Sequence, residues 1–185
     1  PLLLDAPGAV TIRWTGSTAG GLTLEGEQGV GFPGAKVLDL SPVLVEGPDP
    51  AIFAMDGRKY RGRLRIKLAT AEGTQVRAIN SVGIEDYLAG VIGHEMPLRW
   101  SDAALHVQAI AARTYALTNL HPGKDHDLKA DTRSQVYRGL MAEDARARKL
   151  VDDTRGQVVT QDGKMVVTYF HSTCGGDTVP ATWIF

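Results

Sequence analysis

The fold of the central part of the chain is decided by the stretch Ile84-Glu-Asp-Tyr-Leu-Ala-Gly-Val-Ile-Gly-His-Glu95. At about 100° per residue, its apolar side chains fall on one stripe of a helix: Ile84, Leu88, Val91 and Ile92. Pro97 follows closely and disfavours further helical turns. The spacing therefore predicts one helix from Ile84 to Glu95, with its apolar stripe turned towards a core.

Glu95 is the most informative residue of this stretch, because it projects into the middle of the apolar stripe. A carboxylate in that place is either buried or at the floor of a cleft. Desolvation favours its protonated form, and the negative end of the helix dipole acts in the same direction. A glutamate that is protonated near neutral pH is suited to act as a general acid. Two structural alternatives stay open: Glu95 turns outward past Pro97, or Arg99 or Arg113 neutralises it.

Helical patterns continue after this stretch. A second helix is expected to begin near Ser101 or Asp102, either of which can cap it, and to run to about Leu120. Its middle is rich in alanine and has few charges, so it should be buried on most sides. A third helix is expected from about Ala142 to Asp153. A β hairpin follows, with strands at 157–161 and 165–171 around the turn Asp162-Gly163.

Residues 1–80 are punctuated by proline and glycine, which argues against long helices there. The expected strands are 10–14, 21–25, 51–55 and 60–68, and Asp56-Gly57 is a hairpin signal. Together these elements predict an α+β fold. It has a β-rich N-terminal half, central antiparallel helices that carry Glu95, and a C-terminal β hairpin.

Cations alternate with apolar residues in the expected strand 60–68. A period of two places four cations on one face: Arg61, Arg63, Arg65 and Lys67. This face is either the solvated side of a half-buried strand or a surface that attracts an anionic polymer.

The overall composition excludes several classes of protein. The 185 residues are 43% hydrophobic and 22% charged, which is close to the average for globular proteins. The formal net charge is −1, so no global positive field attracts nucleic acid, and we expect no nucleic-acid partner. No apolar run is long enough for a transmembrane segment. The single cysteine, Cys174, excludes an internal disulfide framework and a multi-cysteine zinc site.

An ordered set of motifs runs through the second half of the chain. It consists of Glu85-Asp-Tyr-Leu-Ala-Gly-Val-Ile-Gly-His-Glu-Met-Pro-Leu-Arg-Trp100, Gln108-Ala-Ile-Ala-Ala-Arg-Thr-Tyr-Ala116, Gln135-Val-Tyr-Arg-Gly139, Thr154-Arg-Gly156 and Tyr169-Phe-His-Ser-Thr-Cys-Gly-Gly176. The joint pattern closely resembles the stage II sporulation protein D (SpoIID, amidase-enhancer) family over about residues 56–178.

This resemblance implies a lytic transglycosylase that cleaves peptidoglycan glycan strands, best known on strands without stem peptides. The family's catalytic glutamate falls on Glu95. The substrate's own 6-hydroxyl would attack C1 of the muramic residue and form a 1,6-anhydro sugar, so one carboxylate acts first as acid and then as base. Polar side chains would hold the sugars; the candidates are Gln135, Tyr137, Tyr169, His171, Ser172, Tyr87 and Arg113.

No metal and no cofactor is expected. Residues 121–131 contain His and Asp, which bind metals in many proteins, but their spacing matches no standard site for zinc or a hard cation. Cys174 lies three residues after His171, which is weak support for a thiol nucleophile, and a role in a local glycine turn is favoured.

An alternative comes from a different class of function. A non-catalytic module could bind peptidoglycan and stimulate a separate amidase, as the amidase-enhancer name suggests. Replacement of Glu95 by Gln separates the two hypotheses, because a binding module tolerates this change and a transglycosylase does not. The expected partners are peptidoglycan glycan strands and a cell-wall amidase.

The resemblance also sets the expected domain boundaries. Residues 1–55 are a β-rich region, either unassigned or part of the same domain, and residues 56–185 are the SpoIID-like domain. Relatives usually continue beyond the Cys-Gly-Gly turn, so we expect this domain to be truncated at its C-terminus. We expect an exported protein of the cell envelope, periplasm or extracellular space, with its signal or anchor outside this sequence.

Overall fold

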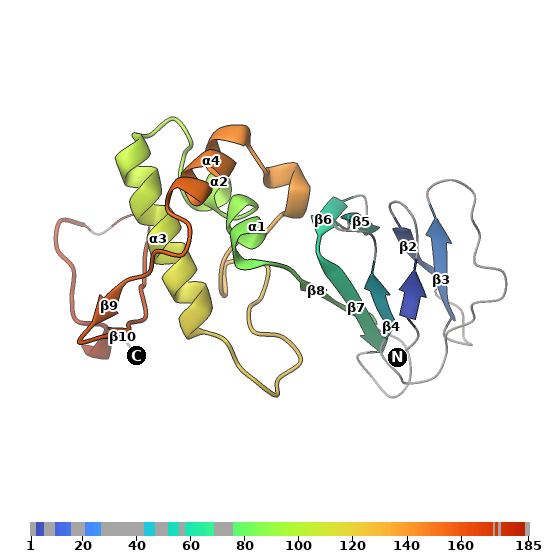
Figure 1. Cartoon of the computed structure of the whole chain (residues 1–185). Helices are drawn as coiled ribbons and strands as arrows, with labels where there is room; N and C mark the ends of the chain where they lie inside the picture. Colours follow the sequence, from blue (N-terminus) through green and yellow to red (C-terminus); the bar gives the residue numbers. More distant parts are fainter. Residues whose placement is uncertain are drawn as a thin grey trace.

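The computed structural model describes residues 3–5, 10–15, 21–26, 43–46, 52–55, 58–68, 76–171, 173 and 175–183. A strand-rich part and a helical part are joined where β8 (Val76–Ser81) leads into α1 (Ile84–Ala89), as Figure 1 shows. The chain is therefore a mixed fold of helices and strands, which confirms this part of the prediction.

Within the described residues, the strands of the first half form two four-stranded sheets. One sheet has the order β1-β4-β7-β8, with β1 (Leu3–Asp5), β4 (Val43–Glu46) and β7 (Arg63–Leu68). The other has the order β3-β2-β5-β6, with β3 (Gly21–Gly26), β2 (Val10–Thr15), β5 (Ile52–Met55) and β6 (Arg58–Arg61). β5 and β6 pair antiparallel with Met55 opposite Arg58, so the second sheet contains strands from both sides of the expected domain boundary. The Asp56-Gly57 turn lies outside the described residues.

The prediction of one strand over 60–68 is wrong, because Gly62 separates β6 from β7. Gly62 has φ +91°, and a Cβ at this position would lie 2.2 Å from the carbonyl oxygen of Ser81. A side chain is therefore excluded by both conformation and space. The interruption places Arg61 at the end of β6, where its Nε donates to Oε1 of Glu143 at 2.9 Å. Arg63 and Arg65 remain on β7, and the side chain of Lys67 lies outside the described residues.

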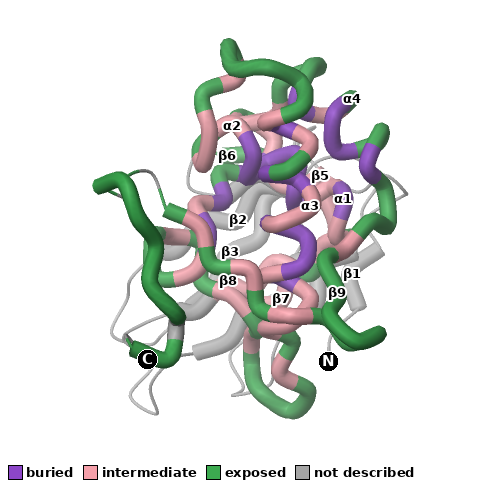
Figure 2. Tube along the Cα trace, turned by 90° about the vertical axis from the view of Figure 1, so that its left-hand side faces the viewer, coloured by how far each residue is buried: buried purple, intermediate pink, exposed green. Residues whose placement is uncertain are grey.

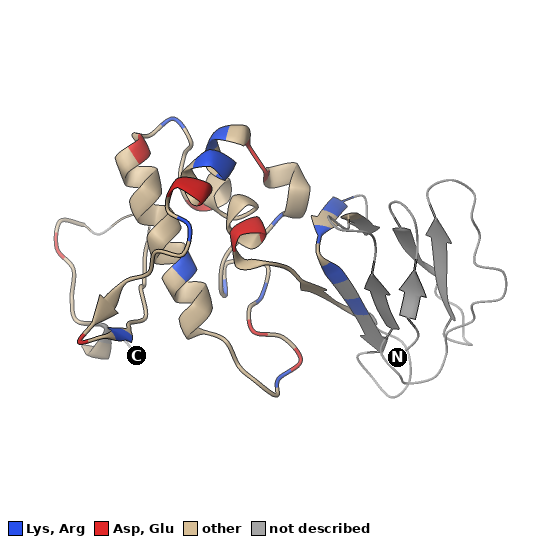
Figure 3. Cartoon of the chain, in the orientation of Figure 1, with Lys and Arg blue, Asp and Glu red and all other residues tan. Residues whose placement is uncertain are grey.

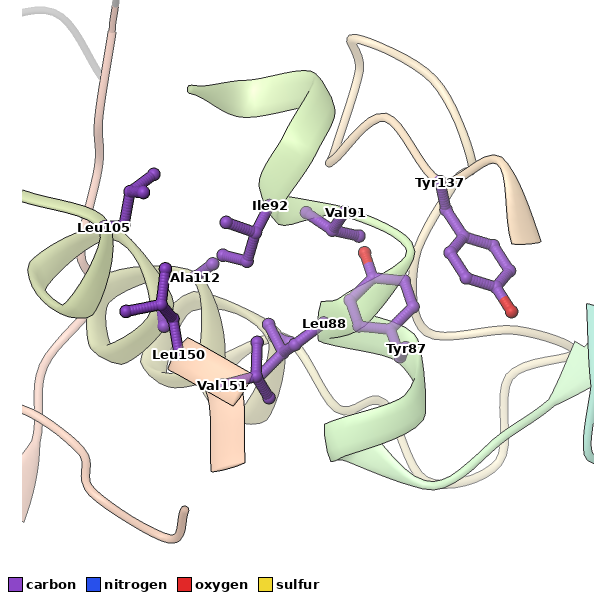
Figure 4. Close-up of a cluster of buried hydrophobic side chains, with 11 residues drawn as sticks. Tyr87, Leu88, Val91, Ile92, Leu105, Ala112, Tyr137, Leu150 and Val151 are labelled. Carbon is purple, nitrogen blue, oxygen red and sulfur yellow. The ribbon is translucent and has the colours of Figure 1, made fainter. Parts of the chain in front are cut away.

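The helical part packs around one apolar core. Its helices are α1, α2 (Ile92–Glu95), α3 (Asp102–Thr118) and α4 (Ala145–Asp153). In Figure 2 the buried trace runs through these helices, and Figure 4 shows their aliphatic side chains gathered together. The fully or almost fully buried members include Leu88, Val91, Ile92, Leu105, Ala109, Ala112, Leu150 and Val151. Each large aliphatic side chain contributes about 1.5–3 kcal/mol by leaving water.

α3 follows the prediction closely. It begins after Ser101, whose hydroxyl oxygen accepts from the backbone N–H of Ala104 at 3.4 Å and so caps the helix. Ala109, Ala112 and Ala116 are buried on it, and such small side chains allow neighbouring elements to approach closely. α3 is therefore the central helix on which the other helices pack.

The prediction of a single helix from Ile84 to Glu95 is wrong, and Gly90 provides the reason. α1 ends at Ala89 and α2 begins at Ile92. A Cβ at Gly90 would lie 2.8 Å from Cε2 of Tyr137 and 3.1 Å from the carbonyl oxygen of Gly139. The Gly90 carbonyl also accepts from the N–H of Arg138 at 3.4 Å. The break therefore brings the segment 137–139 against the helices.

The third helix also begins later than expected. A short 3₁₀ helix, η1 (Gly139–Ala142), comes first, and α4 then starts after Asp144. The Asp144 carboxylate accepts from the N–H of Arg146 at 2.8 Å, which caps α4 and fixes its first residue.

The turn of the predicted C-terminal hairpin is confirmed, although its strands are shorter than expected. β9 (Thr160–Gln161) and β10 (Lys164–Met165) pair across Asp162 and Gly163, which have φ of 51° and 73°. Two positive φ angles define the tight hairpin turn that Asp-Gly favours. A second 3₁₀ helix, η2 (Ala181–Trp183), follows. No helix in the described part of the chain is long and apolar enough to cross a membrane.

Candidate functional site

Glu95 is the last residue of α2, and its side chain is half-buried. Its Oε1 accepts a hydrogen bond of 2.8 Å from the backbone N–H of Val136. Among the residues that the structure describes, Oε2 has no hydrogen-bond partner, and neither Arg99 nor Arg113 forms an ion pair with the carboxylate. Of the two structural alternatives, neutralisation by an arginine therefore does not apply. Oε1 of Glu95 is therefore fixed by a hydrogen bond, whereas Oε2 is available.

Segment 135–137 presents this N–H, and two inward-facing side chains fix the segment. Gln135 is completely buried; its Nε2 donates to the carbonyl oxygen of Ala112 on α3 at 3.2 Å, and its Oε1 accepts from the hydroxyl of Tyr87 at 3.0 Å. Tyr137 is also buried, and its hydroxyl donates to Oδ1 of Asn80 on β8 at 3.0 Å. The backbone between them is therefore anchored to both the helices and the sheet.

Asn80 extends this anchor into the strands. Its Nδ2 donates to the carbonyl oxygen of Arg61 at 2.8 Å and to that of Arg63 at 3.2 Å, on either side of Gly62. The sheet at the end of β6, the ring of Tyr137 and the segment that binds Glu95 thus form one connected network. Asn80 was not among the residues expected from the sequence, because the polar strand β8 gives no local signal that singles it out.

The rings of Tyr87 and Tyr137 lie side by side, with centroids 5.1 Å apart, as Figure 4 shows. Burial, followed by the charge of nearby Glu95, raises the pKa of Tyr87 well above its ordinary value. Burial also raises the pKa of Tyr137. Both hydroxyl groups therefore stay protonated at neutral pH and act as hydrogen-bond donors to Gln135 and Asn80.

Arg113 is 1% exposed, and its hydrogen bonds go to groups other than Glu95. Its Nη2 and Nε donate to the two carboxylate oxygens of Glu85 at 2.6 and 3.1 Å. Nη2 also donates to the carbonyl oxygen of Val151 at 3.1 Å, and Nη1 donates to that of Gln157 at 3.2 Å. These contacts join α1, α3 and α4. Arg113 is therefore a structural clamp between the helices, and its guanidinium has no exposed surface for a sugar.

The candidates near the C-terminus are on an exposed segment. Tyr169 is 55% exposed, and its ring lies 6.4 Å from that of Tyr115 on α3. Thr168 fixes the segment to the same helix, because its hydroxyl donates to the carbonyl oxygen of Ala111 at 2.6 Å. His171 is exposed, and Ser172 lies outside the described residues, as does Cys174. Exposed tyrosine and histidine side chains remain accessible to a ligand.

The structure thus divides the seven predicted binding residues into groups. Tyr87, Gln135 and Tyr137 come together beside Glu95, but their polar groups bind other protein groups. Arg113 belongs to the clamp with Glu85. Within the described residues, no group of three or more His, Cys, Asp or Glu side chains could hold a metal ion. The backbone N–H of Val136 was missed, because any residue except proline offers this donor.

These observations define a mixed helix–strand domain with a half-buried glutamate held by the main chain of a neighbouring segment. Residues 72–161 match the family model SpoIID, described as Stage II sporulation protein. This region contains Glu95 and the segment 135–137.

Three relatives are similar to this chain, and two of them carry names of this family. The chain is 35% identical over 136 residues to an uncharacterized protein of Brachyspira hyodysenteriae, which covers 72% of this chain and 36% of that protein. It is 38% identical over 92 residues to the amidase enhancer of Bacillus subtilis, which covers 49% of this chain and 12% of that protein. It is 26% identical over 122 residues to stage II sporulation protein D of Bacillus amyloliquefaciens, which covers 57% of this chain and 36% of that protein.

Residues 72–161 are therefore a match to the stage II sporulation protein D family, which confirms over this region the resemblance seen in the sequence. The matches span about a third of the length of the Brachyspira protein and of stage II sporulation protein D, and a smaller share of the amidase enhancer.

Proposed function

We propose that this chain is a lytic transglycosylase that cleaves peptidoglycan glycan strands without stem peptides, with Glu95 as its single acid and base. The observation that carries the proposal is the one-sided fixation of Glu95. The N–H of Val136 holds Oε1 at 2.8 Å, while Oε2 has no partner in the described part of the chain. A carboxyl group fixed in this way has one oxygen available for proton transfer.

The proposed reaction needs no water and no second carboxylate. Protonated Glu95 gives its proton to the glycosidic oxygen as the bond from that oxygen to C1 of the muramic residue breaks. The 6-hydroxyl of the same sugar forms a new bond to C1 and gives its proton to the Glu95 carboxylate. The product is a 1,6-anhydro sugar, and the glutamate returns to its protonated form. Intramolecular attack has a high effective molarity, which replaces an enzymatic nucleophile.

The state of the neighbouring carboxylates supports a single-carboxylate reaction. Glu85 is bound to Arg113, and Asp86 accepts from Arg148 at 2.8 Å. Burial alone would raise the pKa of Glu143, but its bonds to Arg61 and Arg148 outweigh this effect and hold the pKa below its ordinary value. Glycosidases that use water or a covalent intermediate need a second free carboxyl group facing the first. These three carboxylates are engaged in the fold instead.

The binding residues then divide by exposure. We propose that Tyr169 and His171, which are exposed, contact the sugar chain, together with Ser172 on the same segment. An exposed tyrosine ring provides a face for a sugar and a hydroxyl for hydrogen bonding. Tyr87, Gln135 and Tyr137 hold the segment that positions Glu95, and Arg113 holds the helices together. Residues 1–55 and 56–185 act together, because β5 and β6 pair across that boundary.

A second candidate function is a non-catalytic module that binds peptidoglycan and stimulates an amidase. The observation that favours it is the printed name of one relative, amidase enhancer, at 38% identity. In both cases the partners are glycan strands, and in the second also an amidase. Both functions place the protein outside the cytoplasm, in the cell envelope, because the substrate is there.

Mass spectrometry of purified glycan strands separates the two functions. Strands with and without stem peptides are incubated with the wild type, with Glu95→Gln and with the control Asp152→Asn, which removes an exposed carboxylate on α4. We expect products one water lighter than hydrolysis products with the wild type and the control, and a loss of about 10²–10⁴-fold with Glu95→Gln. Intact strands bound equally by all three proteins would establish the binding module instead.

A further inference from the structure

The side-chain amide of Gln108, on α3, is buried without a hydrogen-bond partner. Gln108 is 6% exposed, and its Nε2 is buried and makes no hydrogen bond within the described part of the chain. Gln135 provides the contrast, because its amide is also buried but uses both of its polar atoms. An unpaired buried amide lowers the stability of a folded protein. In natural proteins such conflicts are expected at functional sites.

α3 surrounds this amide with small and uncharged side chains. The neighbours of Gln108 one turn further along the helix are Ala111 and Ala112. Figure 3 shows α3 as a largely uncharged helix, because its only Lys, Arg, Asp or Glu residues are Asp102 and Arg113, near its two ends. A neutral polar group with a small apolar part is therefore the kind of ligand that suits this face of α3.

Two other segments are fixed to this turn of α3 by consecutive carbonyl groups. The carbonyl oxygen of Ala112 accepts from Nε2 of Gln135 at 3.2 Å. The carbonyl oxygen of Ala111 accepts from the hydroxyl of Thr168 at 2.6 Å. At about 100° per residue, the side chain of Gln108 lies between those of Ala112 and Ala111, about 40° from the first and about 60° from the second. Gln108 therefore faces the junction between these two segments.

The two segments carry the proposed catalytic and sugar-binding groups. In the first, Gln135 is followed directly by Val136, which donates to Oε1 of Glu95 at 2.8 Å. In the second, Tyr169 has an exposed ring that we propose as a sugar contact. The side chain of Gln108 thus lies between the segment that positions Glu95 and an exposed aromatic residue. A sugar bound against both segments would place one of its substituents over Gln108.

We propose that Gln108 binds the acetamido group of a sugar in the glycan strand, an inference that rests on the proposed substrate. Both sugars of a peptidoglycan strand carry this group, which consists of an N–H, a carbonyl oxygen and a methyl group. The carboxamide of Gln108 can donate to the carbonyl oxygen and accept from the N–H, while the methyl group packs against the alanine side chains. The terminal torsion of glutamine is broad and roughly two-fold, so the amide can turn its NH₂ group towards the ligand. The strand thereby supplies the partner that the described residues do not.

Binding of defined tetrasaccharides tests the proposal without cleavage, in the full chain that carries Glu95→Gln as the parent protein. One probe is a tetrasaccharide of a glycan strand without stem peptides, and the other is the same tetrasaccharide with its acetyl groups removed. We expect the parent to bind the acetylated probe roughly tenfold more tightly, and Gln108→Met to lose this preference. Val107→Ala, which changes an exposed neighbour on α3, should retain it. The amino groups that deacetylation leaves are common to all three measurements, so their charge does not affect the comparison.

Stability provides a second readout, which a purely structural role of Gln108 would move in the opposite direction. Methionine has a similar size and no amide, so Gln108→Met should leave the midpoint of urea unfolding unchanged or raise it. Gln135→Met is the control at a paired amide. It should lower the midpoint, because the carbonyl oxygen of Ala112 and the hydroxyl of Tyr87 lose this partner.

Three results would overturn the proposal. The first is equal binding of the two probes, or no binding of either, by the parent protein. The second is a preference for the acetylated probe that survives in Gln108→Met. The third is a lowered unfolding midpoint for Gln108→Met, which would assign the amide to the fold or to a buried water molecule. Absence of cleavage by the wild type, with the acetyl preference intact, would refute the catalytic function and support the assignment of Gln108.

Discussion

Two glutamates of the same short stretch have opposite environments. Glu85, in the first turn of α1, is buried and uses both carboxylate oxygens: Arg113 binds both, and the N–H of Gly156 donates to Oε1 at 3.2 Å. Glu95, at the end of α2, is half-buried, and within the described residues one backbone N–H is its only hydrogen-bond donor. The first carboxylate is committed to joining helices, and the second is left able to exchange a proton. The two glutamates thus differ both in burial and in the number of their partners.

The largest expected effect is the difference in stability between the variants Glu85→Gln and Glu95→Gln. Glu85→Gln leaves the guanidinium of Arg113 buried without a counter-charge, so the free energy of unfolding should fall by about 3–5 kcal/mol. Glu95→Gln should change it by no more than about 0.5 kcal/mol, because the amide oxygen can still accept from Val136. Urea unfolding of the two variants measures both values. Equal losses of stability would contradict the distinction between the two sites.

The break between the two glutamates gives a second, smaller effect. Gly90→Ala places a Cβ 2.8 Å from the Tyr137 ring and should reduce the free energy of unfolding by about 2 kcal/mol. The matched change Gly93→Ala meets nothing closer than Cδ1 of Leu98 at 3.5 Å, so it should be neutral or stabilising by up to about 1 kcal/mol. Thermal or urea unfolding checks the opposite signs. A stable Gly90→Ala variant would show that the break does not depend on this contact.

The smallest effect concerns the hydroxyl of Tyr87, which lies between the two glutamates along the chain. Tyr87→Phe removes the donor to buried Gln135 and should cost about 1 kcal/mol. Because burial raises the pKa of Tyr87 above its ordinary value of 10.0, its contribution is fully present below pH 10 and is lost as the pH rises further. Between pH 8 and 11, the free energy of unfolding should therefore fall less steeply with pH for Tyr87→Phe than for the wild type. Identical slopes would show that the folded protein ionises this tyrosine as easily as the unfolded chain.

Local pattern predicted those parts of the fold that depend on neighbours in sequence. The bounds of α3 follow from Ser101 and an alanine-rich run, and the Asp162-Gly163 turn follows from two residues with positive φ. The interruptions at Gly90 and Gly62 were missed, because each depends on an atom of a distant segment, the Tyr137 ring or the Ser81 carbonyl. A glycine within a helical or strand pattern does not by itself reveal such a neighbour.

The candidate site shows the same limit at the level of side chains. Glu95 was identified because a carboxylate on an apolar stripe conflicts with its surroundings. Gln135 and Tyr137 were expected to contact sugars, whereas the structure directs their polar groups to Ala112 and Asn80. Polar residues in one motif can serve either a ligand or the fold, and only tertiary contacts decide which. Arg113 was also expected to contact sugars, whereas its guanidinium binds Glu85 and the carbonyl oxygen of Val151.

The hydrogen bond from Val136 to Glu95 has a consequence for how this site withstands mutation. The donor is a main-chain group, so every amino acid except proline supplies it at position 136. All valine codons begin with G and U, whereas proline codons begin with two C bases, so no single nucleotide change converts one into the other. Any single-nucleotide substitution in the valine codon at position 136 therefore leaves a residue that still supplies the N–H that holds the proposed catalytic glutamate.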